Sequence, residues 1–167
     1  MIKLEQEGFV ELISKRGAMV RDVSFSEFFE MHETIVALER YAFSRAKSRG
    51  SVFDLVRLKS CLDAQATALE KNDYLSYYSS GFEFAMIIIE TLNNKKMLDV
   101  IDLFRDRMVF KIVTYRKTHP NTKPHVALRT HNAMYQALAE DNISEAASEL
   151  MRNLGAISKY LMKNRLL

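Results

Sequence analysis

The sequence has few residues that interrupt helices, since it contains only five glycines and two prolines in 167 residues. Leu, Ala, Met, Glu and Lys, which favour helices, are plentiful. A many-stranded sheet would need more turn-forming residues, so the composition predicts an all-α protein. The length and the 48% hydrophobic content suit one sizeable core, and the chain is too short for two large domains.

Other absences exclude whole classes of protein. Cys61 is the only cysteine, so no intrachain disulfide can form, and a reducing compartment is consistent with this. The charged N-terminus does not resemble a signal peptide, and no uncharged run approaches the ~18 residues that span a bilayer. We therefore expect a cytoplasmic protein without a membrane partner. The net charge of +3 is far from the basic excess of a dedicated nucleic-acid binder.

Sequence motifs for catalysis are also missing. The chain has no glycine-rich phosphate loop, nucleotide-binding fingerprint, Cys-x-x-Cys pair, His-Glu-x-x-His motif or nucleophile elbow. Cys61 lies among apolar helical positions, which indicates a small buried side chain rather than a nucleophile. We expect that the protein is not an enzyme.

Six segments show the periodicity of helices. Their ends are marked by capping residues, by Asn93-Asn94, and by a loop over residues 118–124 that contains both prolines. The expected helices cover residues 24–48, 51–71 and 73–94, then the stretch from Asn94 to the loop, the stretch from the loop to Asp141, and the residues after Asn142. Their short connections predict antiparallel packing around the third helix.

The third helix is the expected core. Nearly every residue from Phe82 to Leu92 is apolar, which predicts burial on most sides of the helix. Gly81 and Ala85 lie four residues apart on one face. A glycine inside a helix costs roughly 1 kcal/mol relative to alanine, so either a gap or a close neighbour is expected beside that face.

Residues 1–22 differ from the rest of the chain. Phe9–Leu12 and Ala18–Arg21 are short strand-like runs, and Gly17 supplies the backbone freedom of a tight connection. A hairpin is therefore expected here. An isolated hairpin is marginally stable in water, so this segment is expected to be part of a larger unit.

Several segments, in their order and spacing, resemble the C-terminal half of a bacterial GntR-superfamily regulator with an FCD (FadR-type) ligand domain. These segments are Leu4–Val10, Arg16–Val20, Phe29–Glu39, Phe84–Asn94, Thr130-His131 and Ala147–Asn153. The resemblance implies that residues 23–167 form an FCD-like antiparallel bundle of six or seven helices, which binds an effector and dimerises. It implies that residues 1–22 are the remnant of a winged helix-turn-helix, comprising the end of its recognition helix and its wing.

Family members bind a small organic acid, often beside a divalent metal held by one Asp and three His. The present sequence departs from that pattern. The Asp position is Gly81, two of the His positions are Ala85 and Leu154, and only His131 remains. Since zinc sites need three or four protein ligands and other divalent ions comparable numbers, we expect no metal and no other cofactor.

The candidate ligand-binding residues are His32, Gly81, Ala85, His131 and Leu154. His32 stands where the family commonly has an arginine that points into the cavity, so the two imidazoles can together hold a carboxylate. The three small or apolar residues favour an effector with an apolar body. Two alternatives remain open: both histidines are core residues satisfied by neighbouring groups, or the small residues only allow a second helix to come close.

The resemblance places DNA contacts in the wing, at Lys15, Arg16 and Gly17. The residues that read bases in such a domain would lie before Met1. Residues 1–22 carry four basic and four acidic side chains, so we expect no specific operator binding by this polypeptide.

The leading functional hypothesis is an effector-binding and dimerisation portion of a GntR/FadR-type transcriptional regulator. It would be a homodimer that senses a small organic acid or acyl compound and contacts DNA only through a winged helix. The alternative is a stand-alone dimerisation protein, deficient in DNA binding, that holds no ligand.

Overall fold

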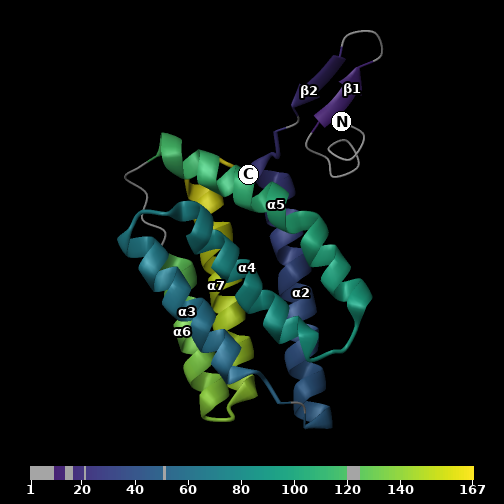
Figure 1. Ribbon diagram of the computed structural model, residues 1–167, viewed down its shortest axis with the longest axis vertical. Helices are drawn as coiled ribbons and strands as arrows, with labels where there is room; N and C mark the ends of the chain where they lie inside the picture. Colours follow the sequence, from purple (N-terminus) through teal and green to yellow (C-terminus); the bar gives the residue numbers. More distant parts are fainter. Residues whose placement is uncertain (1–9, 14–16, 21, 51, 120–124) are drawn as a thin grey trace.

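A computed structural model of the chain describes residues 10–13, 17–20, 22–50, 52–119 and 125–167. The described part contains six helices, which pack as an elongated antiparallel bundle (Figure 1). These are α2 Phe25–Arg49, α3 Leu55–Glu70, α4 Tyr74–Glu90, α5 Lys95–Thr118, α6 His125–Ala139 and α7 Ile143–Lys163. The predicted all-α bundle is confirmed. No helix in these ranges is long and apolar enough to cross a membrane.

The helix ends follow from capping residues. The Ser24 Oγ accepts a hydrogen bond of 3.0 Å from the Glu27 backbone N–H, and α2 ends at Gly50, whose φ of 65° is left-handed. Helix α3 begins later than expected, because the Asp54 carboxylate caps it by accepting from the Arg57 N–H at 3.0 Å. The predicted start at Ser51 is therefore wrong for the helix itself, and Ser51 lies outside the described residues.

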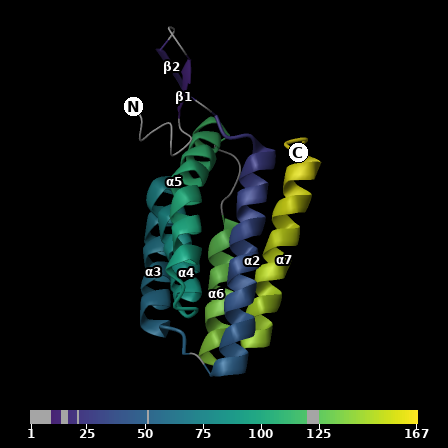
Figure 2. The same cartoon turned by 90° about the vertical axis from the view of Figure 1, so that its right-hand side faces the viewer.

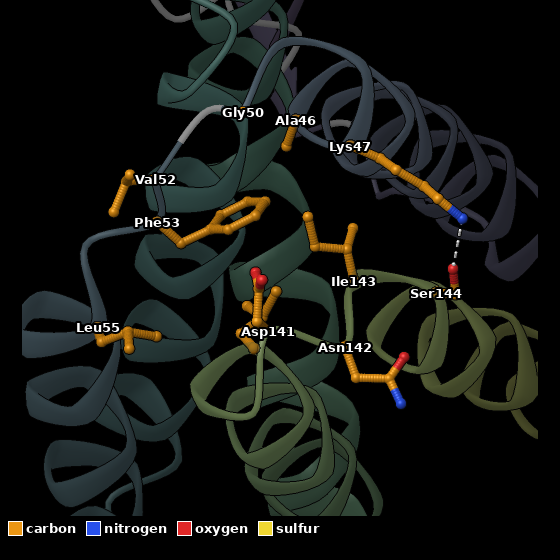
Figure 3. A pocket seen from close by; sticks show the side chains of 11 residues that line it. Ala46, Lys47, Gly50, Val52, Phe53, Leu55, Asp141, Asn142, Ile143 and Ser144 are labelled. Atoms are coloured by element: carbon orange, nitrogen blue, oxygen red, sulfur yellow. Dashed lines mark hydrogen bonds between the residues drawn. The ribbon is translucent and has the colours of Figure 1, made fainter.

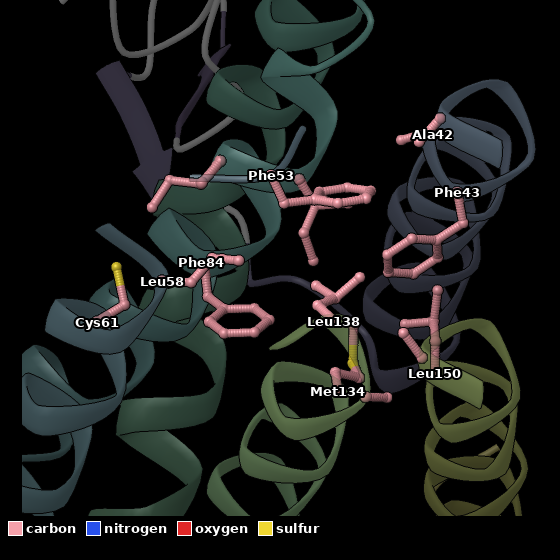
Figure 4. Close-up of a cluster of buried hydrophobic side chains, with 14 of the residues drawn as sticks. Ala42, Phe43, Phe53, Leu58, Cys61, Phe84, Met134, Leu138 and Leu150 are labelled. Atoms are coloured by element: carbon pink, nitrogen blue, oxygen red, sulfur yellow. The ribbon is translucent and has the colours of Figure 1, made fainter. Parts of the chain in front are cut away.

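Helix α4 lies at the centre of the bundle and contacts α2, α3, α5 and α6. Tyr77, Phe84, Ile88 and Ile89 are fully buried, as expected for the apolar run. The larger of two core clusters lies on one side of α4, where Phe84 faces Met134 and other side chains of α6, with α2 and α7 beyond them (Figure 4). Burial of such side chains contributes about 25 cal/mol per Å² of apolar surface. The smaller cluster joins α4 to α5 and α2.

The buried face of α7 differs from the prediction. The periodicity of apolar residues in this segment, Ala147, Met151, Leu154, Ile157 and Leu161, predicts an inward-facing Met151. In the structure 37% of Met151 is exposed, whereas Leu150 and Asn153 are buried. The buried positions Ala146, Leu150, Asn153 and Leu161 follow a regular helical spacing that includes one polar residue. If the buried face of α7 is chosen by apolar residues alone, the set of positions next to the buried one is selected instead.

The basic side of α5 is only partly solvated. Arg107 forms an ion pair with Glu27, and the Lys111 Nζ lies 2.8 Å from the Asp22 Oδ2. A helix side that carries several basic residues is predicted to be solvated. Arg107 and Lys111 are largely buried, so this prediction is wrong at these two positions. The two pairs attach α5 to the start of α2 (Figure 2).

Two short strands precede the bundle and project past its end (Figure 1). β1 (Val10–Ile13) and β2 (Gly17–Val20) are antiparallel, with Val10 opposite Val20 and Ile13 opposite Gly17. Lys15 and Arg16, which the sequence places in a wing, lie outside the described residues. The assignment of this strand pair to a DNA-binding wing stays a prediction.

Candidate functional site

A cavity of about 130 Å³, here called the inner cavity, lies inside the bundle, and all six helices contribute to its lining. Four of the five candidate residues lie together on it, namely His32, Gly81, Ala85 and His131. Leu154 does not line this cavity, because its side chain packs against the larger core cluster. The preceding residue, Asn153, lines the cavity instead.

The reason for glycine at position 81 is a pair of close side chains. A Cβ added to Gly81 would lie 2.9 Å from the Gln65 Nε2 and 3.3 Å from the His131 Cε1. The missing side chain therefore makes room for Gln65 and His131, which corresponds to the close neighbour that the sequence left as one possibility. Because the cavity is also present, the two explanations for the small residues both apply.

His131 is held in one orientation. The Gln65 Nε2 donates to the Tyr77 carbonyl at 3.2 Å, which turns the Gln65 Oε1 toward the His131 Nδ1 at 2.8 Å. The Nδ1 therefore carries the proton, and the Nε2 of the neutral ring keeps its lone pair. The ring also stacks on Phe84 with centroids 4.5 Å apart. Burial, and secondarily the nearby His32, lower the pKa of His131 to about 4, so the ring is uncharged at neutral pH.

Two buried polar atoms on the inner cavity have no hydrogen-bond partner among the described residues. They are the His32 Nε2 and the Asn153 Oδ1. Leaving a buried donor or acceptor unsatisfied costs roughly 1–3 kcal/mol, so such atoms are uncommon in a finished core. Burial also lowers the pKa of His32 to about 4. The inner cavity thus combines uncharged polar groups with an apolar wall.

The lining does not fit the Asp and three His of metal-binding relatives. Within the described ranges, no three His, Cys, Asp or Glu side chains lie close enough together to hold an ion. The space that an Asp at position 81 would need is occupied by Gln65 and His131. We therefore assign no role to a metal in this cavity. That the cavity binds no metal stays a prediction.

A second cavity of about 230 Å³, here called the outer cavity, adjoins the inner one. Both are lined by Phe28, Tyr78, Ile112, Ala127, Asn153 and Ile157. The outer cavity adds Arg116, whose Nε donates to the Tyr78 hydroxyl at 3.0 Å, and Tyr115 and Tyr160, whose hydroxyls are 3.2 Å apart. Sequence analysis did not single out Tyr78, Arg116 or Asn153. The sequence signal that could have identified Asn153 as a cavity residue is its position, since it is a polar residue at the helical spacing of the buried positions of α7.

A larger hollow of about 590 Å³ lies where α2 meets α3 and α6 meets α7, at the end of the bundle away from the strands (Figures 1 and 3). Part of its polar lining is engaged in hydrogen bonds. The Lys47 Nζ donates to the Ser144 Oγ at 3.1 Å, and the Asn142 side chain caps α7. We therefore take the inner cavity as the candidate site, because unsatisfied polar atoms line it.

The family model of the FCD domain matches residues 30–156. The chain belongs to the FCD family. The matched range contains every helix that lines the inner cavity, in whole or in part. The resemblance to the FCD domain of GntR-family regulators, drawn from the sequence, is thereby confirmed, and this family consists of regulator domains rather than enzymes.

Relatives of this FCD domain include transcriptional regulators. An uncharacterised HTH-type regulator from the TAR-I ttuE-ttuC' intergenic region of Agrobacterium vitis is 29% identical over 89 residues. The match covers 50% of this chain and 51% of that relative, so the chain spans about half the length of the curated relative.

Two solved structures share the fold of this FCD domain. The first is that of Lar, described as controlling expression of the Listeria monocytogenes agr system, with a TM-score of 0.77 and 18% identity over 97% of this chain and 76% of that chain. The second, described as a GntR regulator from Rhodococcus sp. RHA1, has a TM-score of 0.76 and 18% identity over 96% of this chain and 76% of that chain.

Proposed function

We propose that this FCD domain is the effector-binding and dimerisation portion of a GntR/FadR-type transcriptional regulator in the cytoplasm. The observation that supports this most directly is the inner cavity, where the buried His32 Nε2 and Asn153 Oδ1 have no partner within the described residues. A cavity of this kind, apolar with a few polar groups, is typical of small-molecule sites. The effector is a small organic acid or acyl compound bound without a metal.

The test is thermal unfolding with a panel of small organic acids and acyl compounds. A ligand present at 100 times its Kd stabilises the folded state by about 2.7 kcal/mol, which raises Tm. Ala85→Leu fills the inner cavity, so it is expected to abolish this rise. Ala64→Leu, on an exposed position of α3, is the matched control and keeps it. A rise in Tm that Ala85→Leu leaves intact would place the effector elsewhere.

The proposal that no metal takes part has its own experiment. Calorimetric titration with zinc or nickel is expected to give the same weak heat for the wild type and for His131→Phe. A structure with an ion on His131 and two further protein ligands would contradict the proposal.

Dimerisation is proposed through the outer face of α5. Leu103 and Phe110 are each about half exposed and lie seven residues apart, so they share one face of the helix. Light scattering after size exclusion is expected to give a dimer for the wild type and a monomer for Leu103→Lys. Ala64→Lys, at an exposed position of α3 rather than α5, is the control.

For residues 1–22 we propose the remnant of a winged helix-turn-helix, comprising the end of its recognition helix and its wing, with Lys15, Arg16 and Gly17 as the DNA contacts. Such residues contact phosphates or the minor groove without reading sequence. Electrophoretic shift assays of this polypeptide are expected to show no operator-specific complex at moderate salt.

A second candidate function is a dimerisation protein that holds no effector. The packing of Gln65 and His131 against Gly81 favours it, because these side chains already fill part of the space beside α4. A wild-type Tm unchanged across the whole panel, together with a dimer in solution, would support this candidate.

A further inference from the structure

The inner and outer cavities adjoin each other. Side chains from α2, α4, α5, α6 and α7 line both, and Asn153 and Tyr78 are among them. A ligand of moderate length can therefore reach from the buried inner end to the outer end. The chemistry of the two ends differs, and this difference sets the orientation of a ligand.

The inner end provides uncharged hydrogen-bonding groups. The Asn153 Oδ1 needs a donor, and the His32 Nε2 accepts or donates according to its tautomer. Asn153 is more than nine-tenths buried, with 8% of its surface exposed. A hydroxyl or an amide can donate to one atom and interact with the other at the same time. A carboxylate cannot donate, and its burial beside an oxygen acceptor is unfavourable.

The charge state of the histidines supports the same conclusion. The pKa values of His32 and His131 lie near 4, chiefly because both rings are buried. Both rings are therefore neutral at pH 7, and protonation of one opposes protonation of the other. Among the residues that the structure describes, no Lys or Arg lines the inner cavity. A buried carboxylate would find no opposite charge there.

The outer end, by contrast, carries a cation. Arg116 lines the outer cavity and donates to the Tyr78 hydroxyl at 3.0 Å. Tyr115 and Tyr160 line the same cavity, and their hydroxyl oxygens are 3.2 Å apart. A guanidinium with neighbouring phenol hydroxyls is a suitable partner for a carboxylate.

We propose that the two cavities hold one effector whose hydroxyl or amide end lies against His32 and Asn153 and whose anionic end lies beside Arg116. The effector's apolar body lies between these ends, against Phe28, Ile112 and Ile157. This inference rests on the proposed function and specifies the class and direction of its ligand. The acid group is directed outward, and the uncharged group is directed into the bundle.

The test uses three series of straight-chain probes with four to eight carbons: plain acids, ω-hydroxy acids and α,ω-diacids. Calorimetric titration of the whole chain at pH 7.5 gives the Kd of each. At the best length, the ω-hydroxy acid is expected to bind at least tenfold more tightly than the plain acid and the diacid. If an ordered water satisfies the inner atoms instead, the plain and hydroxy acids bind equally, which would overturn the inference.

Variants test each end of the ligand separately. Asn153→Leu is expected to weaken the hydroxy acid at least tenfold and to change the plain acid less than threefold. His32→Phe should act in the same direction. Arg116→Gln is expected to weaken both acids at least tenfold, whereas the exposed Lys117→Gln changes neither. Tighter binding of the diacid, or an Asn153→Leu variant that still prefers the hydroxy acid, would contradict the proposed orientation.

The inference and the proposed function fail in different ways. If no acid of the three series binds, but another compound raises the Tm of the wild type and not of Ala85→Leu, the inference is wrong and the proposed function stands. If every compound leaves the wild-type Tm unchanged, both are wrong.

Discussion

Gln65 and His131 are joined by a hydrogen bond of 2.8 Å beside Gly81, in the space that a side chain at position 81 would occupy. The pair connects α3 to α6 across the face of α4. In metal-binding relatives the resemblance places a carboxylate at this position. Here an amide and an imidazole have taken its space, so the polar groups of the cavity are neutral.

The first prediction concerns this contact. Gly81→Ala is expected to destabilise the fold by about 1 kcal/mol or more, because the displaced Gln65 loses its bonds to Tyr77 and His131, which outweighs a helical gain of roughly 1 kcal/mol. In a Gln65→Ala background, the same substitution is expected to be neutral or stabilising. Urea unfolding of the four proteins measures the coupling. Equal effects of Gly81→Ala in both backgrounds would mean that the contact between position 81 and Gln65 does not affect the free energy of unfolding.

The second prediction is acid destabilisation by the two buried histidines. Their folded pKa values of about 4 lie below the ordinary value of 6.5, so the unfolded chain takes up protons first as pH falls. The stabilisation is complete above pH 6.5 and is lost as pH falls to 4, by up to about 3 kcal/mol for each ring. Urea unfolding between pH 7 and 4.5 measures this loss. His131→Phe should reduce it.

The third prediction concerns Glu39, which is buried on α2 with 4% of its surface exposed. Burial raises the pKa of this carboxyl to about 8, from an ordinary value of 4.5. As pH rises, Glu39 therefore loses its carboxyl proton in the unfolded chain before it does so in the folded protein. The free energy of unfolding falls between pH 4.5 and 8 by up to about 1.4 kcal/mol per pH unit. Glu39→Gln is expected to flatten the stability profile from pH 6.5 to 8, where the histidine contributions are constant. Glu140→Gln, on the surface, is the control, and an unchanged slope in Glu39→Gln would contradict the prediction.

The fourth prediction separates stability from binding at Asn153. Asn153→Leu removes an unpartnered buried oxygen and keeps the side-chain volume, so it is expected to stabilise the ligand-free protein by about 1–3 kcal/mol. In the same variant the rise in Tm that an effector produces should be smaller. Asn132→Leu, on an exposed position of α6, gives neither result. A less stable Asn153→Leu protein would indicate that the side chain has a structural partner.

The helix pattern and the capping residues were sufficient to predict the bundle. The apolar run of α4 and the cap at Ser24 act through local physical chemistry, and both appear in the structure as expected. The start of α3 was misplaced, because Ser51 and Asp54 are both good caps and only tertiary packing selects between them. The helix pattern did not specify how the helices are arranged, and the family resemblance predicted the FCD fold.

The lining of the inner cavity was predicted in part. His32, Gly81 and Ala85 were identified because they depart from a family pattern, and His131 because it keeps that pattern. Asn153 was missed because a polar residue is excluded when a helix face is chosen by hydrophobicity. Tyr78 and Arg116 both line the outer cavity because α4 and α5 pack against each other. A local sequence pattern does not predict where two helices meet.

Neighbouring residues of α5 make different contacts within a single helical turn. Met108 and Ile112 face the inner cavity, while Arg107 and Lys111 form ion pairs with Glu27 and Asp22 near the start of α2. Asp22 stands two residues after the end of β2. These two ion pairs connect the helix that lines the cavity to the segment that follows the strand pair.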